Sequence, residues 1–420
     1  MKILGIETSC DETAAAVVEL LPDGSGCRLL SNIVASSIDL HIKYGGVVPE
    51  IAARSHIESI IPTIDEALDQ AKCKWEDVEG IAVTNGAGLG GSLLIGVMTA
   101  RTLAIIKRKP LYAINHVEGH LYSNFITEQS VKSRGQSSYQ LPKQIPGFPM
   151  LGLIVSGGHT QLVLFKDHFK YKLLGQTHDD AIGEAFDKVA KILGLPYPGG
   201  PSITEAAKKG NPLAYNFPKA RSTINQASHV DAMQGNGEQQ TEPYTKYGEG
   251  VAQLFTPHGA SSNSGATSSD GGQAVALRGL GKYDFSFSGI KTAVLRTAQA
   301  EIGEDYAFPS HKLPQRLSEA QKANITASFQ RIAIETIVDK TVTAYEEFKP
   351  KSVIIGGGVA ANQELRQQLA KRLPIAIEFQ DIKLMGDNGA MVASLGCFKA
   401  SLKQQLSDPY KLDISPNLSM

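Results

Sequence analysis

The sequence predicts a mixed α/β protein of two related lobes, each a sheet flanked by helices, with a central cleft between them. A strand–turn–strand pattern at Ile3–Leu20 recurs at Leu151–Phe165, which indicates a weak internal duplication. Amphipathic helical patterns alternate with the apolar strands, as in α/β folds. The chain has 420 residues, of which 42% are hydrophobic, and this is enough to build two domains with separate cores.

The first half begins with an apolar strand that runs into a polar turn. The turn contains Thr8, Ser9, Cys10, Asp11 and Glu12, and a second apolar strand follows at Ala14–Val18. Helical patterns come next, at Ile51–Gln70 and Ser92–Lys107. We expect residues 1–128 to form the amino-terminal lobe and the polar stretch 129–149 to be an exposed loop.

The second half, residues 150–420, repeats the plan. Its hairpin places Ser156, Gly157, Gly158, His159 and Thr160 in the turn. A further strand, Ser352–Ile355, leads into the glycine turn Gly356–Asn362 and then into a helical pattern at Gln363–Lys371. Strand, glycine turn and helix in this order suit the approach of a nucleotide to the backbone. Other amphipathic helices are expected at Ile182–Leu193 and Ala320–Phe348.

One segment of the second half differs in composition from the rest. Within residues 225–282, the stretch Pro257–Gln273 contains no large aliphatic or aromatic side chain. Such a segment cannot bury enough apolar surface to offset the entropy lost on folding. We therefore expect a disordered insertion that does not carry the chemistry.

Charge, cysteines and hydropathy limit the class of protein. The formal net charge is -1, so any contact with nucleic acid needs a local basic patch or a partner protein. The four cysteines show no pair at metal-binding or redox spacing, which favours a reducing compartment. No apolar stretch approaches the length that spans a bilayer, and the amino terminus lacks a signal h-region. We expect a cytoplasmic protein without membrane contact.

Two histidines are spaced for metal binding. His116 and His120 lie four residues apart in HVEGH, so a helix would present both imidazoles on one face. Asp387 is a candidate third ligand, although a helix N-cap is an equally good interpretation of this residue. The alternative for the histidines is a hydrogen-bonded pair without metal. A protease of the H-E-x-x-H type is disfavoured because Glu118 stands midway between the histidines instead of directly after the first.

The turns of the two hairpins and the glycine turn are suited to phosphate. Backbone N–H groups in glycine-rich turns reach phosphate oxygens without obstruction by side chains. Asp187 lies on an amphipathic helix just before the constrained loop Pro198–Pro201, and its carboxylate suits ribose hydroxyls. The alternative for Asp187 is a solvated helix face.

Eight motifs appear in the order of one known family: ETSCDET, YGGVVPEIAARSH, HVEGH, LIVSGGHTQL, GEAFDK, YPGGP, DFSFSGIKT and GGGVAAN. The chain thus resembles the TsaD family of tRNA threonylcarbamoyladenosine synthase subunits, formerly labelled O-sialoglycoprotein endopeptidases. The resemblance implies an actin-like ATPase (ASKHA) superfamily fold and one divalent metal ion, iron or zinc, held by His116, His120 and Asp387. Asp11 and Glu12 match the family's first phosphate-type turn, and we expect one of these candidate catalytic residues to orient or deprotonate the acceptor amine. The adenylate contacts would come from Val155, Ser156, Gly157, Gly158, His159, Asp187, Gly200 and Asn362.

The activity implied by the resemblance is an acyl transfer. The threonylcarbamoyl group of threonylcarbamoyl-AMP would move to the adenosine next to the anticodon of tRNAs that read codons starting with adenine. Accessory partners would be a related pseudo-subunit of the TsaB type and a small ATPase of the TsaE type. A small-molecule kinase of the same fold is the main alternative, but two facing imidazoles do not suit Mg²⁺. A non-catalytic subunit should lack the metal ligands.

Overall fold

The first sheet is formed by the amino-terminal part of the chain. The computed structural model describes residues 1–130, 138–219 and 280–420. Six strands lie in the order β5-β4-β1-β2-β3-β6. Their bounds are β1 Lys2–Glu7, β2 Glu12–Leu20, β3 Cys27–Ser36, β4 Gly80–Gly86, β5 Leu111–Asn115 and β6 Ile126–Gln129.

The second sheet repeats the central part of the first. Its order is β10-β7-β8-β9, with β7 Met150–Val155, β8 Thr160–Asp167, β9 Lys170–Gln176 and β10 Ser352–Gly356. Each sheet contains a three-stranded antiparallel meander whose first strand pairs with a parallel strand, β4 in the first sheet and β10 in the second. The first sheet adds β5 and β6 at its two edges, both parallel to their neighbours. The predicted duplication is confirmed, and so is the mixed α/β class with two sheets.

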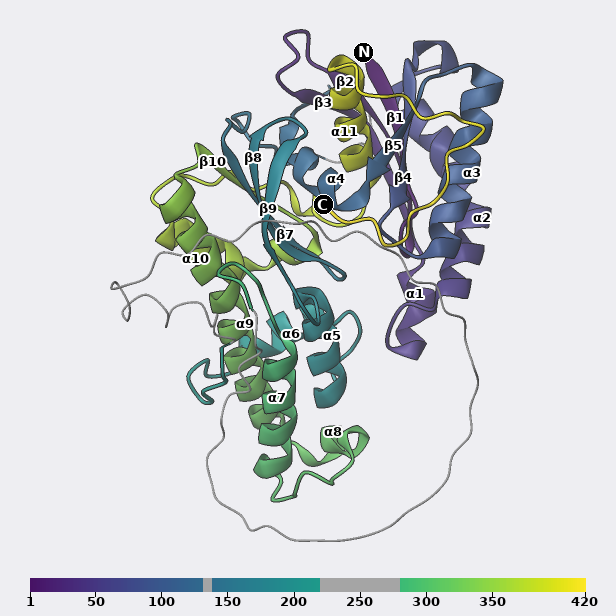
Figure 1. The fold of residues 1–420 in the computed structure, drawn as a ribbon. Helices are drawn as coiled ribbons and strands as arrows, with labels where there is room; N and C mark the ends of the chain where they lie inside the picture. The colour runs from purple at the N-terminus through teal and green to yellow at the C-terminus, as the bar shows by residue number, and fades with distance from the viewer. Residues whose placement is uncertain (131–137, 220–279) are drawn as a thin grey trace, which may run out of the picture.

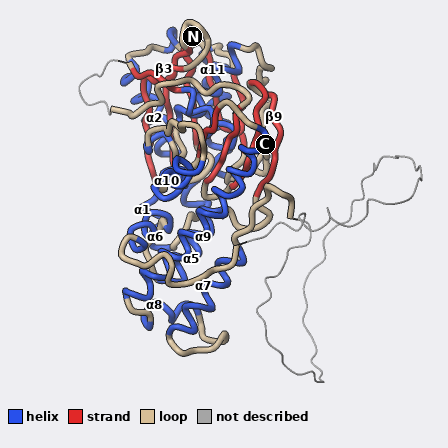
Figure 2. The backbone as a smooth tube through the Cα atoms, turned by 90° about the vertical axis from the view of Figure 1, so that its left-hand side faces the viewer, coloured by secondary structure: helices blue, strands red, loops and turns tan. Residues whose placement is uncertain are grey.

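Helices cover the outer faces of both sheets. On the first sheet these are α2 Pro49–Ala71 and α3 Gly90–Lys107, with the short α1 Ile38–His41 near one end. The second sheet is accompanied by α5 Ile182–Leu193, α6 Gly199–Ala207, α7 Ser288–Glu301, α8 Leu313–Arg316, α9 Glu319–Phe348 and α10 Gln363–Arg372. Figure 2 shows α5, α7, α8 and α9 together at one end of the molecule, beyond the strands.

Two further helices, α4 His116–Tyr122 and α11 Gly389–Ser401, lie between the sheets (Figure 1). Alternate residues of the strands face them: Ile3 and Ala16 from the first sheet share one apolar core with Ile154 from the second. Helix α11 lies very close to β1, since a Cβ on Gly5 would be 2.3 Å from the carbonyl oxygen of Gly389. This contact requires glycine, and it fixes the residues just before α11 at the junction of the sheets.

Three observations in the structure bear on the predicted lobes, loop and insertion. Helix α11 belongs to the predicted second lobe by sequence, but it packs on the first sheet. Residues 138–149 are not simply an exposed loop, because Tyr139, Leu141 and Phe148 pack against the core and Gln140 N–H donates to Asp381 at 2.7 Å. Most of the expected insertion 225–282 lies outside the described residues. At its end, however, Leu280 is buried.

Helix α3 corrects the expectation about membranes. In the described part of the chain, this one helix is long and apolar enough to cross a bilayer by length and composition. Its Leu93, Val97, Ala100 and Ala104 are instead buried in the core on the outer face of the first sheet. One face of α3 thus belongs to the core, although only 33% of its residues are buried.

Candidate metal centre and surrounding turns

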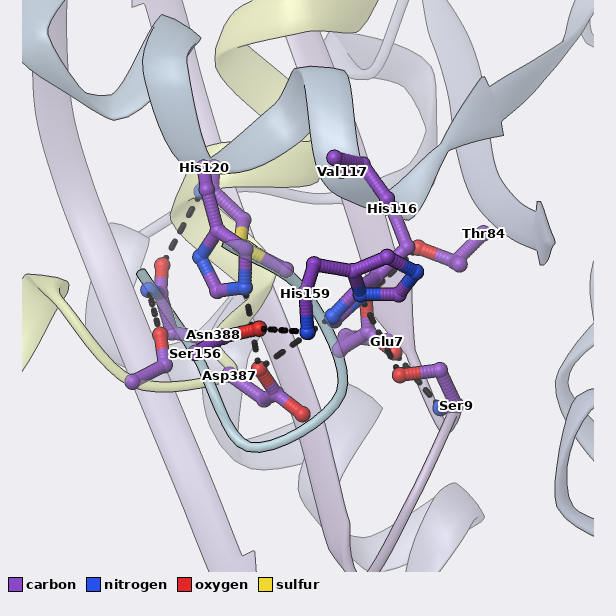
Figure 3. A network of polar contacts seen from close by, with 12 residues as sticks. Glu7, Ser9, Thr84, His116, Val117, His120, Ser156, His159, Asp387 and Asn388 are labelled. Atoms are coloured by element: carbon purple, nitrogen blue, oxygen red, sulfur yellow. Dashed lines mark hydrogen bonds and ion pairs between the residues drawn. The ribbon is translucent and has the colours of Figure 1, made fainter. Parts of the chain in front are cut away.

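Three side chains meet at the junction of the two sheets. His116 and His120 project from α4, and Asp387 lies two residues before α11. The Nε2 atoms of His116 and His120 are 3.5 and 3.4 Å from Asp387 Oδ1, and one potential ligand atom from each residue lies within 4.8 Å of the others. Figure 3 shows both imidazoles beside the Asp387 carboxylate. The structure therefore brings together the three predicted ligands.

The local sequence explains why these side chains point inward. Asn115 is the N-cap of α4, and its Oδ1 accepts hydrogen bonds from the N–H groups of Val117 and Glu118. The N-cap of α11 is Asn388, whose side chain accepts from Met391 N–H. Asp387 therefore does not serve as the cap, which removes the alternative interpretation of this residue and leaves its carboxylate facing the histidines.

A buried carboxylate behind His116 was missed in the sequence. Glu7, at the end of β1, is 0% exposed. Its Oε2 lies 3.2 Å from His116 Nδ1 and accepts from the Thr84 hydroxyl at 2.6 Å, while Oε1 accepts from Ser9 N–H at 2.6 Å. The Ser9 hydroxyl is 3.1 Å from the same Nδ1. A carboxylate at Nδ1 holds the proton there and turns the Nε2 lone pair toward Asp387.

The donor atoms fit a metal ion. Both ring nitrogens of His120 are buried; Nδ1 has no hydrogen-bond partner among the described residues, and Nε2 faces Asp387 Oδ1 at 3.4 Å without forming a well-aligned hydrogen bond. A buried polar atom without a partner costs free energy unless another group satisfies it. Two imidazole nitrogens and one carboxylate oxygen make up a donor set that zinc and iron accept in proteins. A metal ion at Nε2 would give this atom a partner; in the metal-free alternative its neighbour is the Asp387 carboxylate.

The histidines and Asp387 shift one another's pKa values. Burial lowers the pKa of His116, but Asp387 and Glu7 outweigh it and raise this pKa to about 9. Burial raises the pKa of Asp387, yet His116 and His120 hold it well below its usual range. The Asp387 carboxylate is thus kept ionised, as a cation requires, while the proton on His116 must leave before its Nε2 can bind a metal ion.

The turn of the second hairpin lies against this site. Ser156 and His159 bond each other twice: Ser156 N–H donates to His159 O at 2.8 Å, and His159 N–H donates to Ser156 Oγ at 3.0 Å. Burial and the charges of His116 and His120 lower the pKa of His159 to about 4. A Cβ added to Gly157 or Gly158 would meet no atom within 4 Å, so the tip of the turn has open space beside it.

The turn of the first hairpin is fixed through its carbonyl groups. The Cys10 carbonyl is bonded by His56 Nε2 and the Ser92 hydroxyl, each at 3.1 Å. Ser37 donates to the Asp11 carbonyl from both its N–H, at 3.1 Å, and its hydroxyl, at 2.8 Å. Burial, Asp387 and Asp11 raise the pKa of the neighbouring Glu12 carboxyl to about 9. The charge of Asp387 therefore acts on Glu12, although the sequence separates the two residues widely.

The other predicted contacts with the adenylate lie in the second lobe and have structural partners. Asp187 Oδ1 accepts from Gly199 N–H at 2.7 Å, so Asp187 is not a solvated-face residue. Asn362 caps α10 and donates to Thr204 and Gln330. A Cβ on Gly200 would meet no atom within 4 Å, whereas the carbonyl oxygen of the buried Val155 lies against Gly357.

Tyr197 was also missed in the sequence. Burial, Asp187 and Asp11 all raise the pKa of the Tyr197 hydroxyl, so this group responds to carboxylates of both lobes. It precedes the two glycines of YPGGP. The prolines on either side of these glycines predict a constrained loop, but a single tyrosine in the sequence does not predict which side chains lie near it.

Comparison with known proteins identifies the family. The family model described as "TsaD: tRNA N6-adenosine threonylcarbamoyltransferase" matches residues 28–236 and 244–394. A tRNA N6-adenosine threonylcarbamoyltransferase of Thermomicrobium roseum is 40% identical over 95% of this chain and 92% of its own length. One of Dehalococcoides mccartyi is 38% identical over 100% of this chain and 99% of its own length.

Solved structures give weaker similarity. The (R)-2-hydroxyglutaryl-CoA dehydratase component A of Acidaminococcus fermentans covers 96% of this chain and 99% of its own, with 14% identity and a TM-score of 0.43. The assignment therefore relies on the family model and on the full-length relatives. On that basis the chain belongs to the tRNA N6-adenosine threonylcarbamoyltransferase (TsaD) family.

Proposed function

We propose that this chain is a metal-dependent acyltransferase that moves the threonylcarbamoyl group from threonylcarbamoyl-AMP to the N6 amine of a tRNA adenosine. The acceptor is the adenosine next to the anticodon in tRNAs that read codons starting with adenine. The single observation that carries the proposal is the cluster of two buried histidines, His116 and His120, with the half-buried Asp387, in a chain that matches this family over almost its whole length. The cytoplasm is the proposed compartment, consistent with four free cysteines.

Iron or zinc is the proposed metal, held by the three side chains named above. When bound, it supplies a Lewis acid that orients the donor and stabilises negative charge. Glu7 keeps the Nδ1 proton of His116 in place, so the Nε2 lone pair stays available as a ligand.

The second hairpin turn is the proposed site for the adenylate. Gly157 and Gly158 leave open space at the tip, which lets backbone N–H groups approach phosphate or carbonyl oxygens. Val155 and Ser156 support this turn, and His159 stays neutral as a hydrogen-bonding group. Asp187, Gly200 and Asn362 are proposed to hold the nucleoside.

In the transfer step, the N6 amine attacks the carbamoyl carbonyl carbon. A new C–N bond forms, the bond from that carbon to the phosphate oxygen breaks, and AMP leaves with the electron pair. The amine loses one proton. Asp11 and Glu12, at the first hairpin turn, are the proposed residues that orient the amine. Because the pKa of Glu12 is raised to about 9, its carboxyl is protonated near neutral pH and would donate a hydrogen bond. Asp11 is therefore the proposed acceptor of this proton.

Accessory proteins are the proposed partners, one a related pseudo-subunit of the TsaB type and one a small ATPase of the TsaE type. The helices on the outer face of the first sheet support such contacts. Ile57 and Ile61 of α2 are 60% and 51% exposed, and Leu94 and Met98 of α3 are 44% and 46% exposed. Large apolar side chains gathered on adjacent helices favour a protein interface.

The test is a transfer reaction with purified components. The protein is incubated with threonylcarbamoyl-AMP and unmodified tRNA, with and without the accessory proteins, and the nucleosides are analysed by mass spectrometry. His120→Ala should lose most of the product, while His311→Ala, which changes an exposed histidine far from the trio, should keep it. Absence of threonylcarbamoyladenosine with every component present, or phosphate transfer from ATP to a small molecule, would contradict the proposal and favour the kinase alternative.

A further inference from the structure

The segment after α11 runs back along the first lobe. Ser407 N–H donates to the carbonyl of Leu111 at 2.9 Å, and its hydroxyl accepts from Ala113 N–H at 3.1 Å. Arg101 of α3 then donates to the carbonyls of Pro409 and Tyr410, at 2.7 and 2.8 Å. Figure 1 shows this segment as the long yellow trace that ends beside α4. It is fixed to β5 and α3 before it reaches Asn115.

Residues 413–420, called here the clamp segment, contact the β4–α3 turn. Ser415 N–H donates to the Asn85 carbonyl at 2.6 Å, and Gly88 N–H donates to the Pro416 carbonyl at 3.1 Å. A Cβ on Gly86 would lie 2.0 Å from the Ser415 carbonyl oxygen, so only glycine allows this approach.

The same turn is bonded to the residue that touches His116. Leu89 N–H donates to the Ser9 carbonyl at 2.8 Å. The Ser9 hydroxyl lies 3.1 Å from His116 Nδ1. A chain of direct contacts therefore leads from the clamp segment, through the β4–α3 turn and Ser9, to a proposed metal ligand.

A second and shorter route passes through Asn115. Its Oδ1 accepts from Val117 N–H at 2.9 Å and from Glu118 N–H at 3.3 Å, which caps α4. Its Nδ2 donates to the Ser419 carbonyl at 3.2 Å. One side-chain amide thus joins the start of α4 to the clamp segment. Because His116 directly follows Asn115, the orientation of this amide bears on the placement of the first histidine.

We propose that the clamp segment and Asn115 are positioning elements of the metal centre: the hydrogen bond from Asn115 to Ser419 fixes the amino terminus of α4 and so the direction of His116. Neither element touches the metal or the reacting atoms. The inference relies on the metal centre of the proposed function and adds residues that act through His116.

A double-mutant cycle isolates this hydrogen bond. Asn115→Ser keeps an oxygen that caps α4 but removes the donor to Ser419. A protein that ends at Leu418 removes the acceptor and also Met420, which packs against the core, but leaves the contacts of Ser415 and Pro416. Met420→Ala is therefore measured beside it, so that the loss of this packing can be subtracted. The third protein combines both changes. Ser419→Ala is the control, because the acceptor is a backbone carbonyl that this substitution leaves unchanged.

The first readout is the dissociation constant for zinc, measured by competition with a chelator. Each single change should weaken zinc binding about 2- to 12-fold, the range that corresponds to one neutral hydrogen bond. The combined protein should lose no more than either single one, and Ser419→Ala should bind like the wild type. Wild-type affinity in both single variants, or losses that add up in the combined protein, would overturn the proposal.

The second readout is amide hydrogen exchange at Val117 and Glu118, which does not depend on metal. Both single variants should exchange faster at these two amides, with the melting temperature little changed. If the wild type binds no zinc or iron, the metal centre is wrong, and the exchange data still decide whether the clamp segment orders α4. Unchanged exchange would overturn the clamp in either case.

Discussion

Replacing the buried carboxylate behind His116 should weaken metal binding without unfolding the protein. Glu7→Gln keeps the shape of the side chain but removes its charge. Glu7 accepts hydrogen bonds from Ser9 N–H and Thr84 Oγ1 and faces His116 Nδ1. A glutamine has one acceptor oxygen, so its NH₂ group must face at least one of these donors. The histidine then loses both a charged partner and a fixed orientation.

The expected size follows from that geometry. Partners that orient metal-binding histidines are worth about 10- to 100-fold in metal affinity, or about 1.4–2.7 kcal/mol. The loss of one hydrogen bond to a charged group, about 1.5–3 kcal/mol, agrees with this range. The change should appear in the dissociation constant for zinc, measured by chelator competition, while circular dichroism shows that the protein stays folded.

Glu205→Gln is the matched control, since Glu205 is 65% exposed and pairs with the nearby Lys208. It should leave zinc affinity at the wild-type level. If folded Glu7→Gln also binds zinc as tightly as the wild type, the carboxylate does not orient His116, and the reasoning about Nδ1 is wrong.

Other predictions concern proton linkage, the insertion and the nucleoside. The pKa of His116 without metal is raised to about 9, so zinc must displace a proton from this histidine below that pH. The apparent affinity for zinc should therefore rise between about pH 6.5 and 9, by up to about tenfold per pH unit. Calorimetry that finds no pH dependence would contradict this prediction. Replacing residues 225–279 by a short Gly/Ser bridge should leave the melting temperature nearly unchanged. A longer deletion, of residues 225–282, also removes the buried Leu280 and should lower the free energy of unfolding by about 2–5 kcal/mol. Equal melting temperatures of the two deletion proteins would refute the idea that the folded core resumes at Leu280. Asp187→Ala should weaken AMP binding by about 1.5–3 kcal/mol, and an equal loss with 2′,3′-dideoxy-AMP would assign the effect to the Gly199 contact instead of the ribose.

Most of the fold could be predicted from the hydrophobic periodicity of strands and helices and from the turn motifs between them. The two hairpins follow the period-2 pattern, and the helices at 51–70, 92–107, 182–193 and 320–348 match α2, α3, α5 and α9 within a few residues. The histidine pair was readable because four residues make one helical turn. Asp387 was harder, since only the structure shows that Asn388 takes the capping role.

The missed features depend on contacts between distant residues. Glu7 and His116 are 109 residues apart, and an acidic residue at the end of an apolar strand carries no signal of its partner. The clamp segment uses backbone carbonyls, so its side chains give no pattern at all. Residues 138–149 read as polar and therefore exposed, but backbone N–H groups of Lys143 and Gln144 pair with the Glu378 carboxylate, which holds this stretch against the core.

Elemental analysis of the purified protein tests the central claim, that His116, His120 and Asp387 hold one metal ion. The wild type should contain one equivalent of iron or zinc per chain. His116→Ala removes one of the three protein ligands, so after dialysis against a chelator it should contain almost none. A folded His116→Ala protein that keeps one equivalent would contradict the assignment of the metal centre.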